Sequence, residues 1–146
     1  MKVLHFLLLL HLKVLGIASQ YECPAKGEIT KSNLDRAYFV AKVQVVGERL
    51  QTDKNYYLYD IRYSDFYATY HDLDYTKKYA TRTLGYYAYC AAPLVNGTYY
   101  VIGCFSYETH RCRIVREFDK LTETEKERIK SMISSAYYYY LGWYAY

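Results

Sequence analysis

Cysteine is scarce in this chain, and its spacing argues against one common use of the residue. Only four cysteines occur among 146 residues: Cys23, Cys90, Cys104 and Cys112. None forms the Cys-x-x-Cys pair that is typical of structural zinc modules. His71 stands beside Asp72 and Asp74, but an exposed acidic turn explains that group more simply than a metal cluster does. We therefore predict no metal site of the chain's own and no cofactor.

Catalytic signatures and a strong charge of one sign are also absent. The sequence has no Gly-x-Ser-x-Gly elbow and no phosphate loop, and no histidine lies in a catalytic motif. We therefore expect that the protein is not an enzyme. The formal net charge is +4, and it falls to +2 without Lys2 and Lys13. That balance argues against nucleic acid as a partner.

Long apolar runs are confined to the N-terminus. Lys2 precedes the apolar residues 6–10, His11 and Lys13 interrupt the stretch, and the small residues Gly16, Ala18 and Ser19 follow. This order is typical of a secretory signal peptide over residues 1–19. A membrane-spanning helix needs about 20 mainly apolar residues, and no later stretch approaches that length. We expect residues 20–146 to form one secreted, extracellular domain without membrane insertion.

Export sets the chemistry of the cysteines. In an oxidising compartment four cysteines predict two disulfides, and spacing alone leaves all three pairings open. The sequon Asn96-Gly97-Thr98 lies on a predicted turn, so we expect glycosylation at Asn96.

Tyrosine is the residue present in excess, with 22 copies. It favours strands and keeps a polar tip for water or a partner. The simpler interpretation is a β-rich domain with tyrosine on its inner and outer faces. The alternative is an adhesive or crosslinkable extracellular surface.

Alternating patterns predict a series of short strands. In the first, Phe39, Ala41, Val43 and Val45 share one face, and Lys42 and Gln44 lie on the other. Residues 67–70 and 78–83 are predicted as short strands on either side of an acidic turn at 72–74. The full set of predicted strands is 37–46, 56–63, 67–70, 78–83, 99–105 and 112–115.

In the last predicted element the spacing of apolar residues changes from that of a strand to that of a helix. Thr122 and Glu125 form a capping box, and Ile129, Met132 and Ile133 then recur at helical spacing. Because short strands cannot safely leave their edges open, the pattern favours a small barrel followed by a C-terminal helix. The tail at 137–146 is rich in tyrosine, and its role is left open.

Several segments together resemble the inhibitory domain of the tissue inhibitors of metalloproteinases. The resemblance rests on segments in the same order along the chain: residues 38–42, 57–61, Cys90, Gly97, 100–103, 112–121 and 125–126. It implies a mainly β fold, a five-stranded OB-like barrel of netrin type with a C-terminal α-helix. It also implies a protein that binds the active-site cleft of a secreted or membrane-anchored zinc metalloproteinase.

The same resemblance implies roles for the N-terminal residues. The family begins with Cys-x-Cys, and the amine and carbonyl of its first cysteine clamp the target's zinc. Here Tyr21 stands in the first cysteine's place and Cys23 in the second. The implied disulfides are Cys23–Cys112, as in the family, and Cys90–Cys104 as a replacement.

The predicted protease-binding edge has two parts: Tyr21, Glu22, Cys23 and Pro24, then Tyr87, Ala88 and Tyr89 in the loop before Cys90. The only metal it would contact is the zinc of a target protease. Two alternatives remain open. One is a non-inhibitory netrin-like module that binds extracellular matrix, a receptor or another secreted protein through tyrosine-rich faces. The other is a structural matrix component crosslinked through tyrosine.

Overall fold

The computed structural model describes residues 23–24, 27–51, 56–90, 93–107 and 112–142. The predicted signal peptide 1–19 and the predicted edge residues Tyr21 and Glu22 lie outside these ranges. Side chains are described for all of these residues except 48–51 and 133–142.

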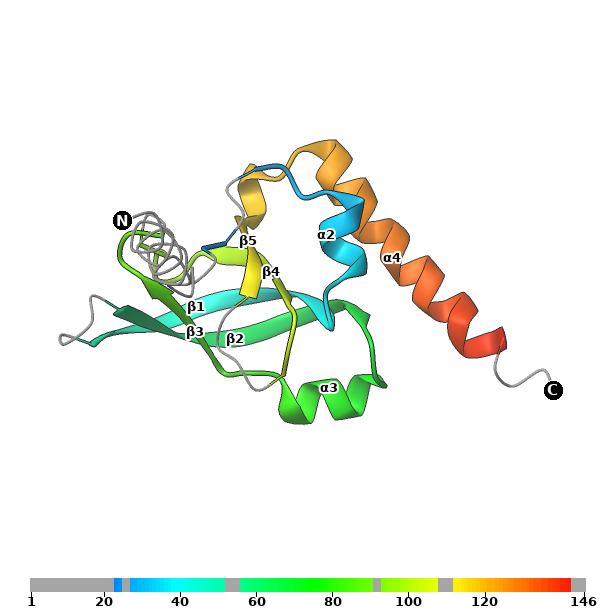
Figure 1. The fold of residues 1–146 in the computed structure, drawn as a ribbon, viewed down its shortest axis with the longest axis horizontal. Helices are drawn as coiled ribbons and strands as arrows, with labels where there is room; N and C mark the ends of the chain where they lie inside the picture. Colours follow the sequence, from blue (N-terminus) through cyan, green and yellow to red (C-terminus); the bar gives the residue numbers. More distant parts are fainter. Residues whose placement is uncertain (1–22, 25–26, 52–55, 91–92, 108–111, 143–146) are drawn as a thin grey trace, which may run out of the picture.

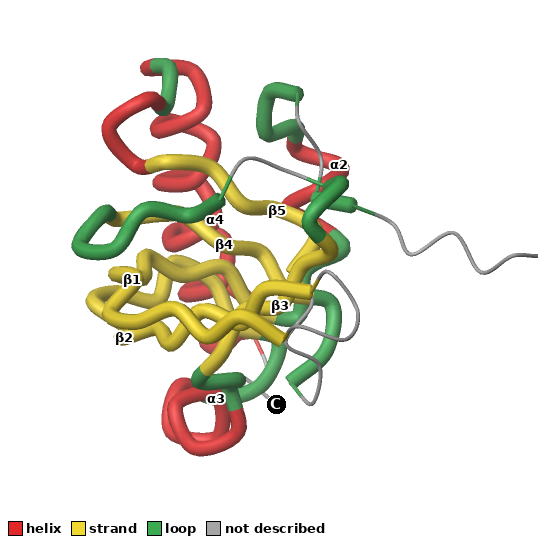
Figure 2. The backbone as a smooth tube through the Cα atoms, turned by 90° about the vertical axis from the view of Figure 1, so that its left-hand side faces the viewer, coloured by secondary structure: helices red, strands yellow, loops and turns green. Residues whose placement is uncertain are grey.

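Five antiparallel strands form one curled sheet (Figures 1 and 2). In spatial order they are β3 (Thr83–Tyr87), β2 (Tyr56–Thr69), β1 (Phe39–Gln51), β4 (Tyr99–Cys104) and β5 (Cys112–Glu117). β1 is the central strand, and its pairing with β2 shifts register at three places, between Val40 and Ala41, Lys42 and Val43, and Val45 and Gly47. Such irregularities bend a strand and increase its twist, so the sheet curls into a half-barrel. The predicted fold class, mainly β with an OB-like sheet and a C-terminal helix, is confirmed.

The alternation predicted for β1 is also confirmed, and it divides the core into two clusters. Phe39, Ala41, Val43 and Val45 are buried in the larger cluster on one face of the sheet. Val40 faces the other way, into a second cluster that includes Leu34 and Ile129 from the helices. Both faces of the sheet are therefore covered, one by its own curl and the other by helices.

The C-terminal helix begins where the sequence predicts. α4 (Glu123–Gly142) follows the short 3-10 helix η1 (Phe118–Lys120). The Thr122 hydroxyl accepts a hydrogen bond from the Glu125 amide at 3.2 Å, and the Glu125 carboxylate accepts one from the Thr122 amide at 2.9 Å. This reciprocal pair is a capping box. Among the described helices, none combines the length and apolar character needed to cross a membrane.

Two predicted strands are wrong. Residues 67–70 are not a separate strand, because β2 continues unbroken to Thr69. Residues 78–83 lie mostly outside any strand: helix α3 (Leu73–Tyr79) occupies this region, and β3 starts only at Thr83. The Asp72 carboxylate accepts a hydrogen bond from the Tyr75 amide at 2.8 Å, so the predicted acidic turn is the N-cap of a helix.

A second short helix, α2 (Lys31–Asp35), was not predicted. Thr30 and Asn33 form a capping box at its start, and its one buried residue, Leu34, enters the smaller core cluster. α2 thereby fixes the segment that leads from the N-terminal edge into β1.

Candidate protein-binding edge

The N-terminal segment is crosslinked to the loop that follows β3. Cys23 and Cys90 form a disulfide across 67 positions of sequence, with their Cα atoms 5.0 Å apart. Cys90 is buried, and Cys23 packs against the larger core cluster. The bond therefore brings two of the predicted edge segments together. We use the name binding edge for Cys23, Pro24, Tyr87, Ala88 and Tyr89.

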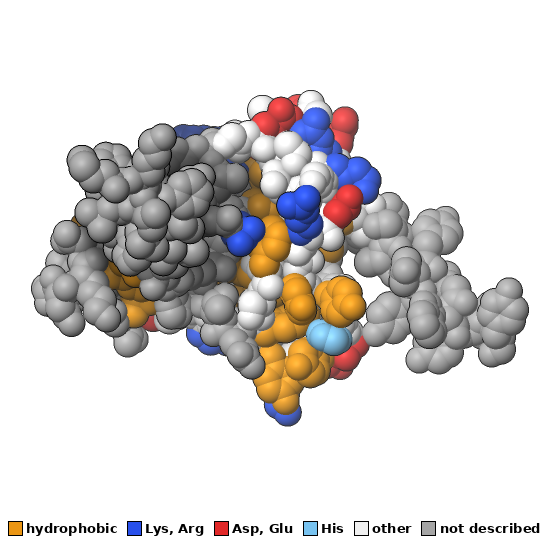
Figure 3. Space-filling model, in the orientation of Figure 1, with side chains coloured by type: hydrophobic (Ala, Val, Ile, Leu, Met, Phe, Trp, Pro, Cys, Tyr) orange, Lys and Arg blue, Asp and Glu red, His pale blue; other side chains and the backbone are white. Residues whose placement is uncertain are grey.

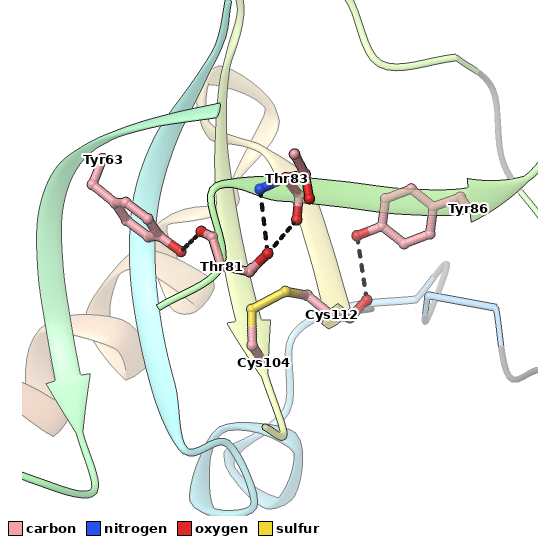
Figure 4. The surroundings of a disulfide bond; sticks show 6 residues. All are labelled: Tyr63, Thr81, Thr83, Tyr86, Cys104 and Cys112. Carbon is pink, nitrogen blue, oxygen red and sulfur yellow. Dashed lines mark hydrogen bonds between the residues drawn. A yellow bond between two sulfur atoms is a disulfide. The ribbon is translucent and has the colours of Figure 1, made fainter. Parts of the chain in front are cut away.

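Both predicted disulfide pairings, Cys23–Cys112 and Cys90–Cys104, are wrong. Cys104 and Cys112 are bonded to each other, because β4 and β5 pair in a register that sets them directly opposite, with Cα atoms 4.1 Å apart (Figure 4). Cysteines that face each other on neighbouring strands, well under 7 Å apart, are within reach of a disulfide. This leaves Cys23 and Cys90 to bond to each other. No described cysteine is free.

The loop of the binding edge offers aromatic rings to solvent. Tyr87 and Tyr89 are stacked, with centroids 5.4 Å apart and planes 15° apart. Tyr87 also meets Tyr56 edge to face at 5.0 Å and packs against the core, whereas 66% of Tyr89 is exposed. The Cys90 amide donates to the Tyr87 carbonyl at 2.9 Å and closes the loop into a turn. Ala88, between the two tyrosines, is exposed. The loop therefore presents one ring that packs against the core, Tyr87, and one that lies mostly in solvent, Tyr89.

On the other side of the disulfide, Pro24 is buried. Its ring fixes one backbone dihedral and removes one donor, so the chain just after Cys23 has little freedom. The binding edge is therefore held at three points: the disulfide, the buried proline and the turn before Cys90.

A second attachment holds the segment between the binding edge and α2. The Ile29 amide donates to the Glu125 carboxylate at 2.8 Å, and Arg128 donates to the Ile29 carbonyl at 2.9 Å. Arg128 also pairs with Glu28 at 2.6 Å. Both partners lie on the first turns of α4, nearly a hundred positions away. These contacts fasten the N-terminal segment to the start of the C-terminal helix.

Glu125 is a fully buried carboxylate at the centre of this attachment. Burial by itself favours the neutral acid, but hydrogen bonds from the Ile29 and Thr122 amides, together with the Arg116 charge, hold the pKa of Glu125 below its ordinary value. The carboxylate is therefore ionised in the folded protein. The capping box indicates this residue in the sequence, but nothing local indicates its bond to Ile29, which is why the attachment was not predicted.

The open side of the half-barrel is bridged by a tyrosine. The Tyr86 hydroxyl, on edge strand β3, donates to the carbonyl of Cys112 on edge strand β5, at 3.4 Å (Figure 4). Burial raises the pKa of Tyr86 well above its ordinary value, so it stays a neutral donor. Tyr63 likewise donates to the Thr81 carbonyl at 2.8 Å, and burial raises its pKa too. These bonds position β3, from which the binding-edge loop extends.

The other predicted sites lie elsewhere on the surface. Asn96 is exposed on a turn before β4, where Gly97 adopts a positive φ of 82°. Glycosylation at Asn96 remains a prediction. His71 packs against the rings of Tyr70, Tyr75 and Tyr107. In the described parts of the chain, no group of three or more histidine, cysteine or acidic residues is arranged to hold a metal ion.

Comparisons with known proteins identify a family and similar solved structures. A family model described as "Excretory-secretory protein 2" matches residues 21–130. The crystal structure of Ancylostoma ceylanicum Excretory-Secretory Protein 2 is similar, with a TM-score of 0.52 and 25% sequence identity over 75% of this chain and 94% of that chain. No curated protein matches.

Proposed function

Because this chain belongs to the excretory-secretory protein 2 family, we propose that it is a secreted protein whose binding edge docks into the active-site cleft of a zinc metalloproteinase. The supporting observation is the Cys23–Cys90 disulfide. In the tissue inhibitors of metalloproteinases, which this chain resembles, the first cysteine contacts the zinc. Its disulfide partner there is the counterpart of Cys90. By that pairing Cys23, and not the position of Tyr21, corresponds to the first cysteine.

The chemistry of contact with a protease zinc follows from this assignment. A catalytic zinc keeps an open position for an outside ligand. The α-amine and carbonyl of Cys23 would fill it and displace the attacking water. The disulfide and Pro24 hold both groups in place before binding, so little conformational entropy is lost on docking. Tyr89, with its open ring, would supply contact area beside the cleft.

The state of the N-terminus decides the strength of this contact. While Glu22 remains attached, the nitrogen of Cys23 is a planar amide whose lone pair is delocalised. Such a nitrogen is a poor metal ligand. In a chain that begins at Cys23 that nitrogen is a free α-amine, whereas in a chain that begins at Gln20 it is a peptide amide. The proposal therefore predicts strong inhibition only for the first.

The experiment compares these two chains. Both are purified with intact disulfides and assayed at micromolar concentration against a panel of matrix metalloproteinases and adamalysin-type proteases. The Cys23 chain should inhibit at least one protease at least a hundredfold better than the Gln20 chain. Acetylating the amine of the Cys23 chain should abolish the difference. If neither chain inhibits any member of the panel, the proposal is wrong.

A second candidate function is a non-inhibitory module that binds extracellular matrix, a receptor or another secreted protein. The observation that favours it is the group of exposed tyrosines around α3: Tyr38, Tyr70, Tyr75 and Tyr79. Exposed aromatic patches are common at protein–protein interfaces. A pull-down from extracellular extract with the Gln20 chain tests it: the captured partner should be lost with Tyr70→Ala and retained with Tyr89→Ala.

A further inference from the structure

Two tyrosines on α3 lie ring against ring at the surface. Tyr75 and Tyr79 are one helical turn apart, with centroids 4.4 Å apart and planes inclined by 42°. Their exposed fractions are 41% and 48%. In the space-filling view, side chains of this region form an apolar patch next to a single histidine, over the place that α3 occupies in Figure 1 (Figure 3). Both rings are therefore close to each other and open to reagents in solution.

The helix that carries them is anchored at both ends. Asp72 caps its start, and the buried Ala80 follows its end, where the Ala80 amide donates to the Thr76 carbonyl at 2.8 Å. Thr76, between the two tyrosines, is fully buried, and its hydroxyl donates to the Asp72 carbonyl and contacts the Tyr107 hydroxyl. The two rings therefore project from a fixed backbone.

We propose that Tyr75 and Tyr79 are a site of oxidative modification, at which a haem peroxidase using hydrogen peroxide joins the two rings within one chain. Each phenol gives up one electron and its hydroxyl proton, which leaves two phenoxyl radicals. One ortho carbon of each ring then forms a carbon–carbon bond, and the hydrogen on each coupled carbon returns to the phenol oxygen. The peroxide accepts the two electrons and two protons and leaves as two molecules of water.

The geometry favours this pair over other tyrosines. Coupling needs two ring carbons in contact, and reactants held together react far faster than the same groups at ordinary concentration. The centroids of Tyr38 and Tyr70, and those of Tyr87 and Tyr89, are 5.4 Å apart, a full ångström farther than in the α3 pair. Tyr56 and Tyr87 are nearer, at 5.0 Å, but Tyr56 is buried and Tyr87 is half-buried against the core, so a peroxidase cannot reach that pair as readily. The nearest non-tyrosine ring to Tyr75 in this cluster is His71, at 4.7 Å, and imidazole gives up an electron less readily than phenol.

The sequence between the two rings makes the product easy to identify. Lys77 and Lys78 lie between Tyr75 and Tyr79. Trypsin therefore separates the two tyrosines into different peptides, and only a covalent bond between the rings keeps those peptides together. Intact mass distinguishes coupling within one chain from coupling between chains.

The test treats the full secreted chain with a haem peroxidase and hydrogen peroxide and isolates the monomer. We expect the monomer to lose two hydrogen atoms, to gain dityrosine fluorescence and to yield a tryptic product that joins the Tyr75 and Tyr79 peptides. Tyr75→Phe and Tyr79→Phe should each lower the monomer's dityrosine fluorescence at least tenfold. Tyr70→Phe, which changes a 74% exposed tyrosine in the same cluster, should leave it unchanged.

Three results would overturn the proposal. One is a crosslink that maps to Tyr38 and Tyr70, or to Tyr75 and His71. Another is dityrosine found only in crosslinked dimers. The third is a Tyr75→Phe monomer that forms as much dityrosine as the unchanged chain. All three readouts are independent of protease inhibition, so they also distinguish this inference from the proposed function.

Discussion

The backbone amide of Ile29 donates a hydrogen bond to the carboxylate of Glu125 at 2.8 Å, across 96 positions of sequence. The bond is buried, and it connects the segment behind the binding edge to the first turn of α4. Glu125 also completes the capping box with Thr122 and pairs with Arg116 at 3.5 Å. One side chain thus fixes the start of a helix and the path of the N-terminal segment.

Replacement of Glu125 by glutamine should destabilise the fold by roughly 2–4 kcal/mol, because an amide removes the charge and points a donor at groups that are themselves donors. Urea unfolding measures the change in the free energy of unfolding. The control is Glu127→Gln on the same helix, where the side chain is exposed, and it should change stability by less than about 0.5 kcal/mol. Equal effects in the two variants would contradict this role for Glu125.

The pH dependence of stability has a definite sign. The pKa of Glu125 in the folded protein lies below its ordinary value of 4.5, so the unfolded chain binds more protons there than the folded one. The stabilisation is therefore complete above pH 4.5 and is lost as pH falls through the folded pKa. Unfolding measured from pH 6 downward, over about four pH units, should show a shallower decline for Glu125→Gln than for the unchanged chain. Parallel curves would contradict the assignment.

Gly103 on β4 has no room for a side chain. A Cβ atom there would lie 2.6 Å from Cδ1 of Ile114 and 3.1 Å from its Cβ. Gly103→Ala should therefore cost about 1–3 kcal/mol by forcing the two strands apart. The double variant Gly103→Ala with Ile114→Ala removes the nearest atom. Its loss of stability, measured by thermal unfolding, should therefore be smaller than the sum of the losses in the two single variants. Simple additivity would show that the clash is not the cause.

Tyr89→Ala should weaken binding without unfolding the protein. In the proposed function its exposed ring contacts the protease, so the inhibition constant of the Cys23 chain should rise about tenfold, or roughly 1.4 kcal/mol. Its melting temperature should change little, because the ring is mostly in solvent. Tyr70→Ala is the matched control: it removes a similarly exposed ring from the α3 side. If both variants weaken inhibition equally, the binding edge is not the contact surface.

Local patterns predicted the elements whose partners are close in sequence. The start of α4 follows from Thr122 and Glu125, which bond across one turn. The burial of β1 follows from simple alternation. Helix α3 was missed because its tyrosines have strand propensity, although Asp72 and the buried spacing of Thr76 and Ala80 fit a short helix.

The candidate site was only partly predictable, because its contacts are long-range. The sequence does not give the register of β4 against β5, and that register is what pairs Cys104 with Cys112 and leaves Cys23 for Cys90. The hydrogen bond between Ile29 and Glu125 also joins residues far apart in the sequence, so no local pattern predicts it. The two segments of the binding edge come from the family resemblance, and their contact with a protease remains a prediction.

The pairing of Cys23 with Cys90 is the central claim, since it holds the two segments of the binding edge together and is the reason that the proposed function assigns the zinc contact to Cys23. Peptide mapping of the unreduced, secreted protein by mass spectrometry tests it directly. We expect one linked peptide pair that contains Cys23 and Cys90 and another that contains Cys104 and Cys112. A linked pair that contains Cys23 and Cys112 would contradict it.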